Sequence, residues 1–193
     1  MSYTPFFAAI LAYFLGAIPF SLLISRAKGV DLRQVGSGNL GATNVYRAMG
    51  LKYAIIVFAL DALKGYIPTY LILNISDQPW LHVGIGFLSI LGHSLSPFVN
   101  FKGGKGAATG LGVLLALSPD VFGTLAVVAA IGIGVTRYVA PITILCCILA
   151  PILLYIMNYP FTYVVFVSVI GLFIIYRHKS NIIRLIQGKE NKV

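Results

Sequence analysis

The chain has 193 residues, of which 59% are hydrophobic and only 10% are charged, and it carries a formal net charge of +9. Its mean hydropathy is +0.92. A water-soluble domain of this size would expose too much apolar surface, so the composition excludes an ordinary soluble enzyme. It predicts an all-α integral membrane protein, because helices satisfy every backbone polar group inside a bilayer.

Seven apolar segments are separated by polar or proline-bearing breaks. Since a bilayer core of about 30 Å takes about 20 helical residues to cross, four segments are long enough and three are short. In chain order they are residues 4–24, 53–73, 80–99, 106–117, 121–136, 138–157 and 161–176. The competing interpretation merges residues 106–136 into one span, but Ser118-Pro119-Asp120 is typical of a turn that starts a new helix. The first segment is kept as a helix because it lacks the basic start of a signal peptide.

Nearly all the basic residues follow the odd-numbered segments. The loops at the opposite end contain Asp77 and Asp120 and no lysine or arginine. Because lysine and arginine favour the cytoplasmic side, we expect the N-terminus outside and the C-terminus in the cytoplasm. An even number of spans would divide the basic clusters between the two sides, so the asymmetry supports seven transmembrane helices in a single polytopic domain, residues 1–193. Nucleic acid is not expected as a partner, since no separate basic domain is present.

The first motif, "VGSGNLGATNVYR" at residues 35–47, contains the spacing G-x-G-x-x-G. A dinucleotide-binding fingerprint needs a preceding strand and an acidic residue about 20 positions later, and both are missing. Gly36, Gly38 and Gly41 still allow backbone N–H groups to approach an anion, and Arg47 offers a planar fork for phosphate. The alternative is a solvated, flexible loop. Neutral donors that suit phosphate oxygens complete the motif: Ser37, Asn39, Thr43 and Asn44.

The second motif, "GHSLSPFVNFKGGKGAATGLG" at residues 92–112, is not a P-loop. Val99 and Gly106 stand where a Walker sequence needs glycine and Ser or Thr. The glycine-rich turn of Gly103, Gly104 and Gly106, with Lys105, instead opens a helix too short to cross the bilayer. We expect such glycine-rich cytoplasmic loops to dip into the bundle, where a helix N-terminus forms an anion site.

The third motif, "YRHKSNIIRLIQGKEN" at residues 176–191, follows the last span and predicts an amphipathic surface helix around residues 182–186. His178 alone favours a surface position, but together with Asn181 and the other two motifs it becomes a candidate substrate contact. Inside the spans, the spacing of Asp61 and Lys64 favours a structural ion pair, and His93 favours a hydrogen bond between helices.

The sequence predicts no metal, because no cluster of histidine, cysteine and carboxylate residues has ligand spacing. It predicts no other cofactor either. Cys146 and Cys147 are neighbours, which cannot form an ordinary disulfide.

The three motifs, the length and the seven spans resemble the bacterial acyl-phosphate:glycerol-3-phosphate acyltransferase family, the PlsY family, over nearly the whole chain. The resemblance implies transfer of a fatty acyl group from acyl phosphate to the 1-hydroxyl of sn-glycerol 3-phosphate, giving lysophosphatidic acid and inorganic phosphate for phospholipid biosynthesis. It implies a multi-pass protein of the bacterial inner membrane with its active site on the cytoplasmic side. Acyl phosphate, glycerol 3-phosphate and membrane lipid are the expected partners, and no site for acyl carrier protein or coenzyme A is visible.

The resemblance also implies roles for individual residues. Those that match the family's catalytic positions are Ser37, Arg47, Lys105, His178 and Asn181, and Glu190 matches an acid with a structural role. Glycerol 3-phosphate would be held by Arg47, Lys105, His178 and Asn181. The acyl-donor phosphate would be held by Ser37, Gly38, Asn39, Gly41, Thr43 and Asn44.

Two other classes of function fit parts of the pattern. A phosphate-ester transporter also uses broken helices, but its site lies near the midplane with access from both sides. An intramembrane serine protease would pair Ser37 with a histidine. Glycerolipid acyltransferases of the soluble type use H-x-x-x-x-D, and the required aspartate is absent after His82, His93 and His178, where Phe87, Phe98 and Ile183 stand. We expect a different mechanism, in which His178 and Asn181 orient glycerol phosphate and the donor's own phosphate accepts the proton.

Overall fold

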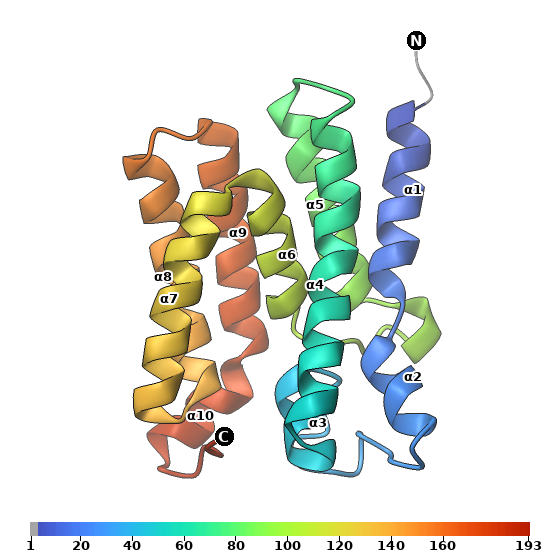
Figure 1. Cartoon of the computed structure of the whole chain (residues 1–193), viewed down its shortest axis with the longest axis vertical. Coiled ribbons are helices and arrows are strands. Elements are labelled where there is room, and N and C mark those ends of the chain that lie inside the picture. The colour runs from blue at the N-terminus through green and yellow to red at the C-terminus, as the bar shows by residue number, and fades with distance from the viewer. Residues whose placement is uncertain (1–3) are drawn as a thin grey trace.

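The computed structural model describes residues 4–193, and these residues form helices and connecting loops without a β-strand (Figure 1). The all-α prediction is therefore confirmed for the described residues. The elements are α1 (Thr4–Ala17), α2 (Phe20–Arg26), α3 (Ala42–Met49), α4 (Leu51–Leu73), α5 (Pro79–Ser94), the short 3₁₀ helix η1 (Pro97–Val99), α6 (Ala107–Leu117), α7 (Pro119–Thr136), α8 (Val139–Ile156), α9 (Phe161–Arg177) and α10 (Lys179–Ile186).

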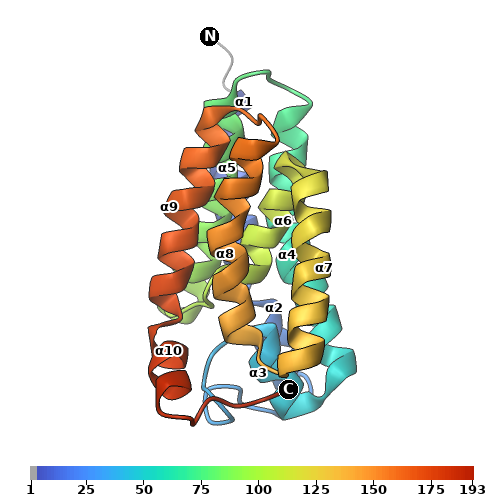
Figure 2. The same ribbon diagram turned by 90° about the vertical axis from the view of Figure 1, so that its left-hand side faces the viewer.

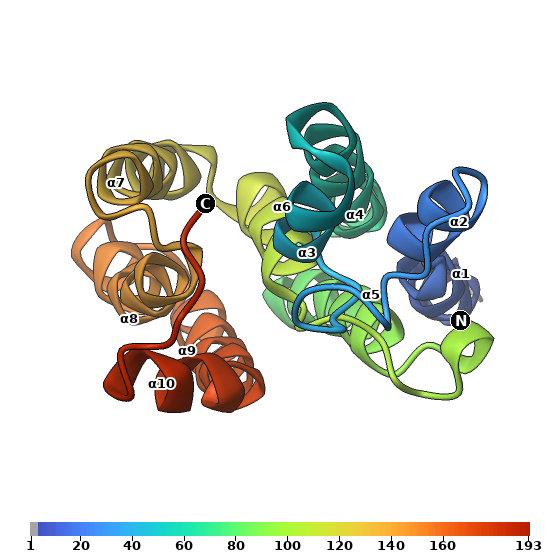
Figure 3. The same ribbon diagram turned by 90° about the horizontal axis from the view of Figure 1, so that it is seen from below.

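The long helices form a bundle whose two ends differ. α1 begins at the upper end in Figure 1, whereas α3, α10 and the C-terminus lie at the lower end. Viewed from below, α7 to α10 form one group, α1 to α5 form the other, and α6 lies between them (Figure 3). The basic loops that the sequence grouped together thus meet at the lower end of the bundle.

Among the described residues, five helical segments are long and apolar enough to cross a membrane, and the bent pair α9 and α10 would make a sixth. The short helix α6 has 11 residues and is also apolar. The alternative of one span over residues 106–136 is wrong, because α6 and α7 fold back on each other at Ser118 and Pro119 (Figure 1). Proline at the first position of α7 starts a new helix and cannot continue the old one.

The first apolar segment is not one continuous helix, as we expected for residues 4–24, but is broken between α1 and α2 at Pro19. Proline has no N–H and its ring clashes with the preceding turn, so backbone carbonyl groups near the break need other donors. The hydroxyl of Ser96 donates to the carbonyl oxygen of Ala17 at 2.6 Å, and Lys64 Nζ donates to that of Ile18 at 3.0 Å. The break is thereby tied to α4 and to the loop after α5.

Glycines bring two helix pairs into backbone contact. On α4 and α6, a Cβ on Gly65 would collide with the carbonyl of Thr109, and a Cβ on Gly112 would collide with that of Ala62. Between α1 and α5, a Cβ on Gly16 or on Gly92 would likewise collide with the backbone of the opposite helix. Small residues permit such close approach between membrane helices, where van der Waals packing replaces the hydrophobic effect. These contacts hold α6 against α4 and so set the position of the glycine-rich loop that precedes α6.

We expect Gly112→Ala to destabilise the fold by about 1–3 kcal/mol, the usual cost of overpacking, because the new methyl group must push α6 away from α4. The matched control is Gly123→Ala on α7, where a Cβ meets no atom within 4 Å. Thermal unfolding in detergent should show a lower midpoint for Gly112→Ala and an unchanged midpoint for the control. Equal midpoints would contradict the close contact.

Candidate active site

A single cavity of about 410 Å³ joins a polar end to an apolar end. The polar end is lined by the loop before α3, by α3, by the start of α6 and by the α9–α10 junction. The apolar end is lined by the facing sides of α6, α7, α8 and α9. Its volume is within the range of about 300–1,000 Å³ that is usual for small-molecule sites. A ligand with a charged head and an apolar tail matches this division.

The first motif folds as a tight loop followed by a helix, and not as the single loop expected between the first two apolar segments. Gly36 and Gly38 adopt left-handed conformations, with φ of 61° and 66°, which glycine adopts without strain. The α3 helix begins after Gly41 and ends at Gly50. Glycine boundaries on both sides were a signal for this helix that was missed. Thr43, Asn44 and Arg47 are therefore presented by a helix.

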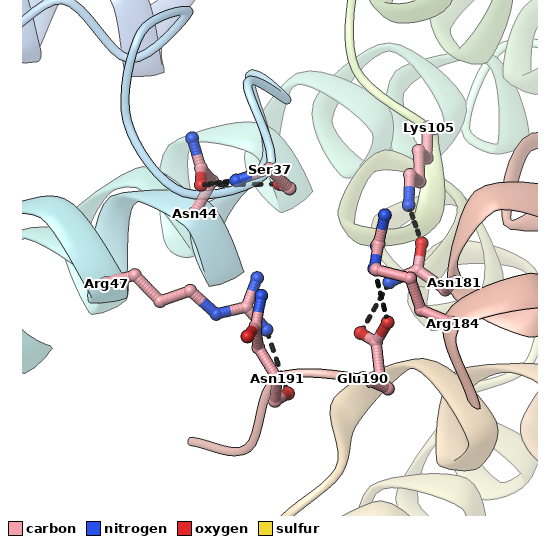
Figure 4. Close-up of polar contacts among 8 residues, drawn as sticks. All are labelled: Ser37, Asn44, Arg47, Lys105, Asn181, Arg184, Glu190 and Asn191. Atoms are coloured by element: carbon pink, nitrogen blue, oxygen red, sulfur yellow. Dashed lines mark hydrogen bonds and ion pairs between the residues drawn. The ribbon is translucent and has the colours of Figure 1, made fainter. Parts of the chain in front are cut away.

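Asn44 organises this loop from within. Its side chain is buried, its Oδ1 accepts the backbone N–H of Ser37 at 2.9 Å, and its Nδ2 donates to the carbonyl oxygen of Leu32 at 3.0 Å. The Ser37 hydroxyl donates to the same Oδ1 at 3.3 Å (Figure 4). The amide of Asn44 thus holds Ser37 at the wall of the cavity, which Asn44 itself, Asn39, Gly41 and Thr43 also line. Gly38 forms the turn and does not line the cavity.

Two helix N-termini face the polar end. Gly41 at the start of α3 and Gly106 at the start of α6 both lack a side-chain cap, and the first residues of each helix line the cavity. Gly106 has a φ of 87°, a left-handed conformation that favours glycine. Backbone N–H groups without intrahelical partners and the positive ends of two helix dipoles therefore converge on one space. This arrangement favours an anion.

A chain of polar contacts fixes the other side of the polar end (Figure 4). Lys105 Nζ donates to Asn181 Oδ1, and Asn181 Nδ2 donates to Glu190 Oε1 at 2.7 Å. The second oxygen of Glu190 pairs with Arg184 Nε at 2.8 Å. Asn181 and Glu190 are both buried. Glu190 thus sets the orientation of the Asn181 amide, which presents its oxygen to Lys105.

Burial, together with the positive charge of Arg184, lowers the pKa of Lys105 to about 8, although Glu190 acts in the opposite direction. The ammonium group is still charged at neutral pH. It is also only partly neutralised by its surroundings, because Glu190 is already paired with Arg184. The local excess of positive charge favours a phosphate at this position.

Arg47 reaches across from α3 toward the C-terminal segment. One terminal nitrogen donates to the carbonyl oxygen of Asn191 at 3.1 Å, whereas its buried Nε has no hydrogen-bond partner among residues 4–193. Burial lowers the pKa of Arg47 from its ordinary value, but a guanidinium remains charged at neutral pH. A buried donor without a partner is costly, so Nε is suited to an acceptor oxygen brought by a ligand.

His178 lies at the junction of α9 and α10 and is buried. Its Nδ1 is 2.8 Å from the carbonyl oxygen of Ile174. Because a carbonyl only accepts, Nδ1 carries the proton and Nε2 is left with its lone pair. Burial, together with the positive charges of Lys105 and Arg177, lowers the pKa of His178 to about 4. The imidazole is therefore neutral at pH 7.

The glycine-rich loop is held from two sides. Arg177 donates to the carbonyl oxygens of Gly103 and Gly104 at 3.2 and 3.0 Å. Gly104 lies against the ring of His93 so closely that a Cβ would collide with Nε2. Gly103 and Gly104 do not line the main cavity, whereas Gly106 and Lys105 do. The two glycines let the loop pack on α5, and Lys105 is presented as a result.

The buried charges of α4 lie next to this loop. Asp61 and Lys64 are 2.7 Å apart, in agreement with the predicted ion pair. Nδ1 of His93 is 3.8 Å from the Asp61 carboxylate. Asp61 and His93 also line the cavity, and Lys64 does not.

The structure brings most of the residues singled out in the sequence to one cavity, and it adds others. The sequence did not indicate three parts of the site: Arg184, Arg177 and the carbonyl of Asn191. It predicted for His93 only a hydrogen bond between helices. Arg184 lies in the third motif, residues 176–191, but its position in the sequence does not indicate that it pairs with Glu190. The pairing depends on the turn after α10.

The apolar half of the cavity is lined by one face of each neighbouring helix. On α7 the lining residues repeat every three or four positions: Phe122, Leu125, Ala126, Ala129 and Ile133. α8 contributes small residues such as Ala140, Thr143 and Ala150, and α9 contributes Phe166, Ile170 and Ile174. Figure 2 shows α7, α8 and α9 side by side with α6 behind them. This face excludes water and suits a hydrocarbon chain.

Comparison with known proteins identifies the family of this chain. The family model described as glycerol-3-phosphate acyltransferase matches residues 6–188. The glycerol-3-phosphate acyltransferase of Aquifex aeolicus (strain VF5) is 46% identical over 188 residues, which cover 96% of this chain and 97% of the relative. The enzyme of the same description from Fusobacterium nucleatum subsp. nucleatum is 43% identical over 185 residues and covers 95% of each chain.

Two solved structures share the fold. The crystal structure of PlsY (YgiH), an integral membrane glycerol 3-phosphate acyltransferase, in its glycerol 3-phosphate form superposes with a TM-score of 0.95 at 45% identity, covering 98% of this chain and 96% of that one. The lysophosphatidic acid form superposes with a TM-score of 0.91 at 43% identity, covering 98% and 95%. The chain is therefore a member of the glycerol-3-phosphate acyltransferase family of integral membrane proteins.

Proposed function

We propose that this protein transfers a fatty acyl group from acyl phosphate to the 1-hydroxyl of sn-glycerol 3-phosphate, giving lysophosphatidic acid and inorganic phosphate. The observation that carries the proposal is the single cavity with a cationic end and an apolar end. Relatives crystallised in glycerol 3-phosphate and lysophosphatidic acid forms supply the acceptor and the product of this reaction. Neither a carrier protein nor coenzyme A is needed by a donor whose only charged part is one phosphate.

In this proposal the two phosphates occupy opposite walls of the polar end. The donor phosphate lies at Ser37 and the uncapped start of α3, where backbone N–H groups are free to donate. Glycerol 3-phosphate lies between Arg47 and Lys105, with His178 and Asn181 beside it. Both phosphates then face positive groups, and the acyl chain extends along α6 to α9.

The chemistry needs no base from the protein. The hydroxyl oxygen of glycerol phosphate attacks the acyl carbon, the bond from that carbon to the phosphate oxygen breaks, and the hydroxyl proton passes to the released phosphate. Nε2 of His178 accepts a hydrogen bond from the attacking hydroxyl and so orients it. An imidazole with a pKa of about 4 cannot retain a proton at neutral pH, which supports the donor phosphate as the final proton acceptor.

We further propose seven transmembrane helices in one domain, residues 1–193, in the bacterial inner membrane. The N-terminus is outside, and the site faces the cytoplasm. The crossing segments are α1 with α2, then α4, α5, α6, α7, α8 and α9. Asp77 and Ala27 are exposed in loops at opposite ends of the bundle. In a cysteine-free background, we expect maleimide to label D77C from outside and A27C from the cytoplasmic side. Labelling of both positions from the same side would contradict this orientation.

The decisive assay uses purified protein, an acyl phosphate and glycerol 3-phosphate, with the lipid product identified by mass spectrometry. We expect stoichiometric lysophosphatidic acid and phosphate, and at least about a hundredfold lower rate with acyl coenzyme A or acyl carrier protein. Comparable rates with a thioester would contradict the donor assignment. Uptake of glycerol 3-phosphate into sealed vesicles without acyl transfer would favour the transporter instead.

His178→Asn should raise KM for glycerol 3-phosphate about tenfold and retain a kcat within about tenfold of wild type, because orientation is weakened while the proton acceptor remains. Arg47→Ala, which removes a phosphate-binding charge, should lower kcat/KM by a hundredfold or more. Steady-state kinetics measure both. A loss of kcat by several orders of magnitude in His178→Asn, with KM unchanged, would identify His178 as the base.

The rate should also depend on the charge of Lys105. Since the pKa of Lys105 is about 8, the ammonium is present below that pH and is lost as the pH rises through it. We expect kcat/KM for glycerol 3-phosphate to fall above about pH 8, where a phosphate monoester is already fully ionised (second pKa about 6). Lys105→Arg should keep its charge and show a flat profile to pH 10. A wild-type profile without this fall would contradict the assignment.

A further inference from the structure

The apolar end of the cavity is lined by four helices that contact one another in pairs. α6 contacts α7, α7 contacts α8, α8 contacts α9, and α9 contacts α6. The last residues that line the cavity toward the upper end are Leu114, Phe122, Ala150 and Phe166, one from each helix. All four helices therefore contribute to the lining at this end of the cavity.

Beyond these residues, three or four positions along α6, α8 and α9 and one position along α7, each helix supplies a buried residue that does not line the cavity. These four residues, which we call the end wall, are Leu117, Val121, Leu154 and Tyr163, with exposed fractions of 6%, 0%, 0% and 5%. They belong to one hydrophobic cluster. None of the four lines the cavity, so the cavity ends before it reaches them.

The end wall is also fixed by a polar anchor. The hydroxyl of Tyr163 lies 2.6 Å from Nδ1 of His82, which is buried on α5. Nε2 of the same imidazole is 2.5 Å from the carbonyl oxygen of Ser76, so Nε2 carries the proton and Nδ1 accepts from Tyr163. The hydrogen bond holds Tyr163 in place, and a packed interior changes shape only at a cost.

The distance from the reacting end to the end wall fits a particular chain length. Along α9, the 12 residues from His178 to Phe166 span about 18 Å at about 1.5 Å per residue. An extended acyl chain rises about 1.25 Å per carbon, given C–C bonds of about 1.5 Å. The cavity therefore holds about 14 carbons, and slightly more where the chain bends.

We propose that the upper end of the cavity sets the upper limit of the acyl chain, so that the protein selects donors of about 14 to 16 carbons. Ala150 and Phe166, the last lining residues in front of the end wall, determine the limit. This inference rests on the proposed function, since it concerns the chain of the acyl donor. A longer chain has no room beyond Phe166, so each further methylene must crowd packed side chains or leave the cavity, and kcat/KM falls for donors above the limit.

The test offers the purified protein an equimolar mixture of saturated acyl phosphates from 8 to 20 carbons, with saturating glycerol 3-phosphate, and measures the lysophosphatidic acids by mass spectrometry. Ala150→Leu adds volume at the last lining position and should shift the preferred length down by about two carbons. Phe166→Ala removes volume there and should shift it up by about two. Because every variant receives the same mixture, differences in donor solubility cancel.

Matched controls carry the same substitutions away from the cavity. Ala130→Leu lies on an exposed position of α7, and Phe161 is 71% exposed at the start of α9, so Ala130→Leu and Phe161→Ala should keep the wild-type profile. If one cavity variant fails to fold, the other decides. Identical profiles in all folded variants would overturn the end wall as a limit. Wild-type protein that makes no lysophosphatidic acid from any donor would overturn the proposed function instead.

Discussion

The contacts from Lys105 through Asn181 to Glu190 are the interaction on which the polar end of the cavity depends. They connect the loop before α6 with α10 and with the segment after it. A lysine partly removed from water is unfavourable unless it is hydrogen-bonded, and Asn181 supplies an acceptor without neutralising the charge. Glu190 in turn is balanced by Arg184. The site therefore keeps an excess of positive charge while its side chains remain fixed.

The position of Lys105 depends in turn on the contacts that hold the glycine-rich loop before α6. Arg177 binds the carbonyls of Gly103 and Gly104, and His93 supports the same loop from α5. The α6 helix that follows is only 11 residues long, and its glycine contacts with α4 keep it deep in the bundle. The short helix leaves its N-terminus inside the protein, where its first N–H groups have no intrahelical partner and line the polar end of the cavity. The same helix then lines one side of the apolar end of the cavity.

The buried charges of α4 are tolerated inside the bundle because Asp61 and Lys64 pair with each other. Lys64 binds both Asp61 and the carbonyl oxygen freed by the break at Pro19. The break between α1 and α2 and the α4 ion pair thus support each other, and removal of either partner would leave a buried polar group unsatisfied. Asp61 lines the cavity and Lys64 does not, so the ion pair lies at the cavity wall beside the polar end.

Composition, hydrophobic spacing and the one-sided lysines and arginines determined the membrane class, most of the long helices and the shared end of the three motifs, because each of these follows from local or summed properties of the chain. They did not determine the break at Pro19 or the short helix α3. The glycine and phosphate-donor pattern likewise indicated Ser37, Arg47, Lys105, His178 and Asn181. Tertiary structure decided which partners these residues have. The pairing of Arg184 with Glu190, the hold of Arg177 on the glycine loop and the internal role of Asn44 depend on turns and helix crossings between residues far apart in sequence. The end wall of the cavity likewise consists of four buried residues from four helices. The sequence of any one of these helices does not specify where along the bundle the residues of the other three lie.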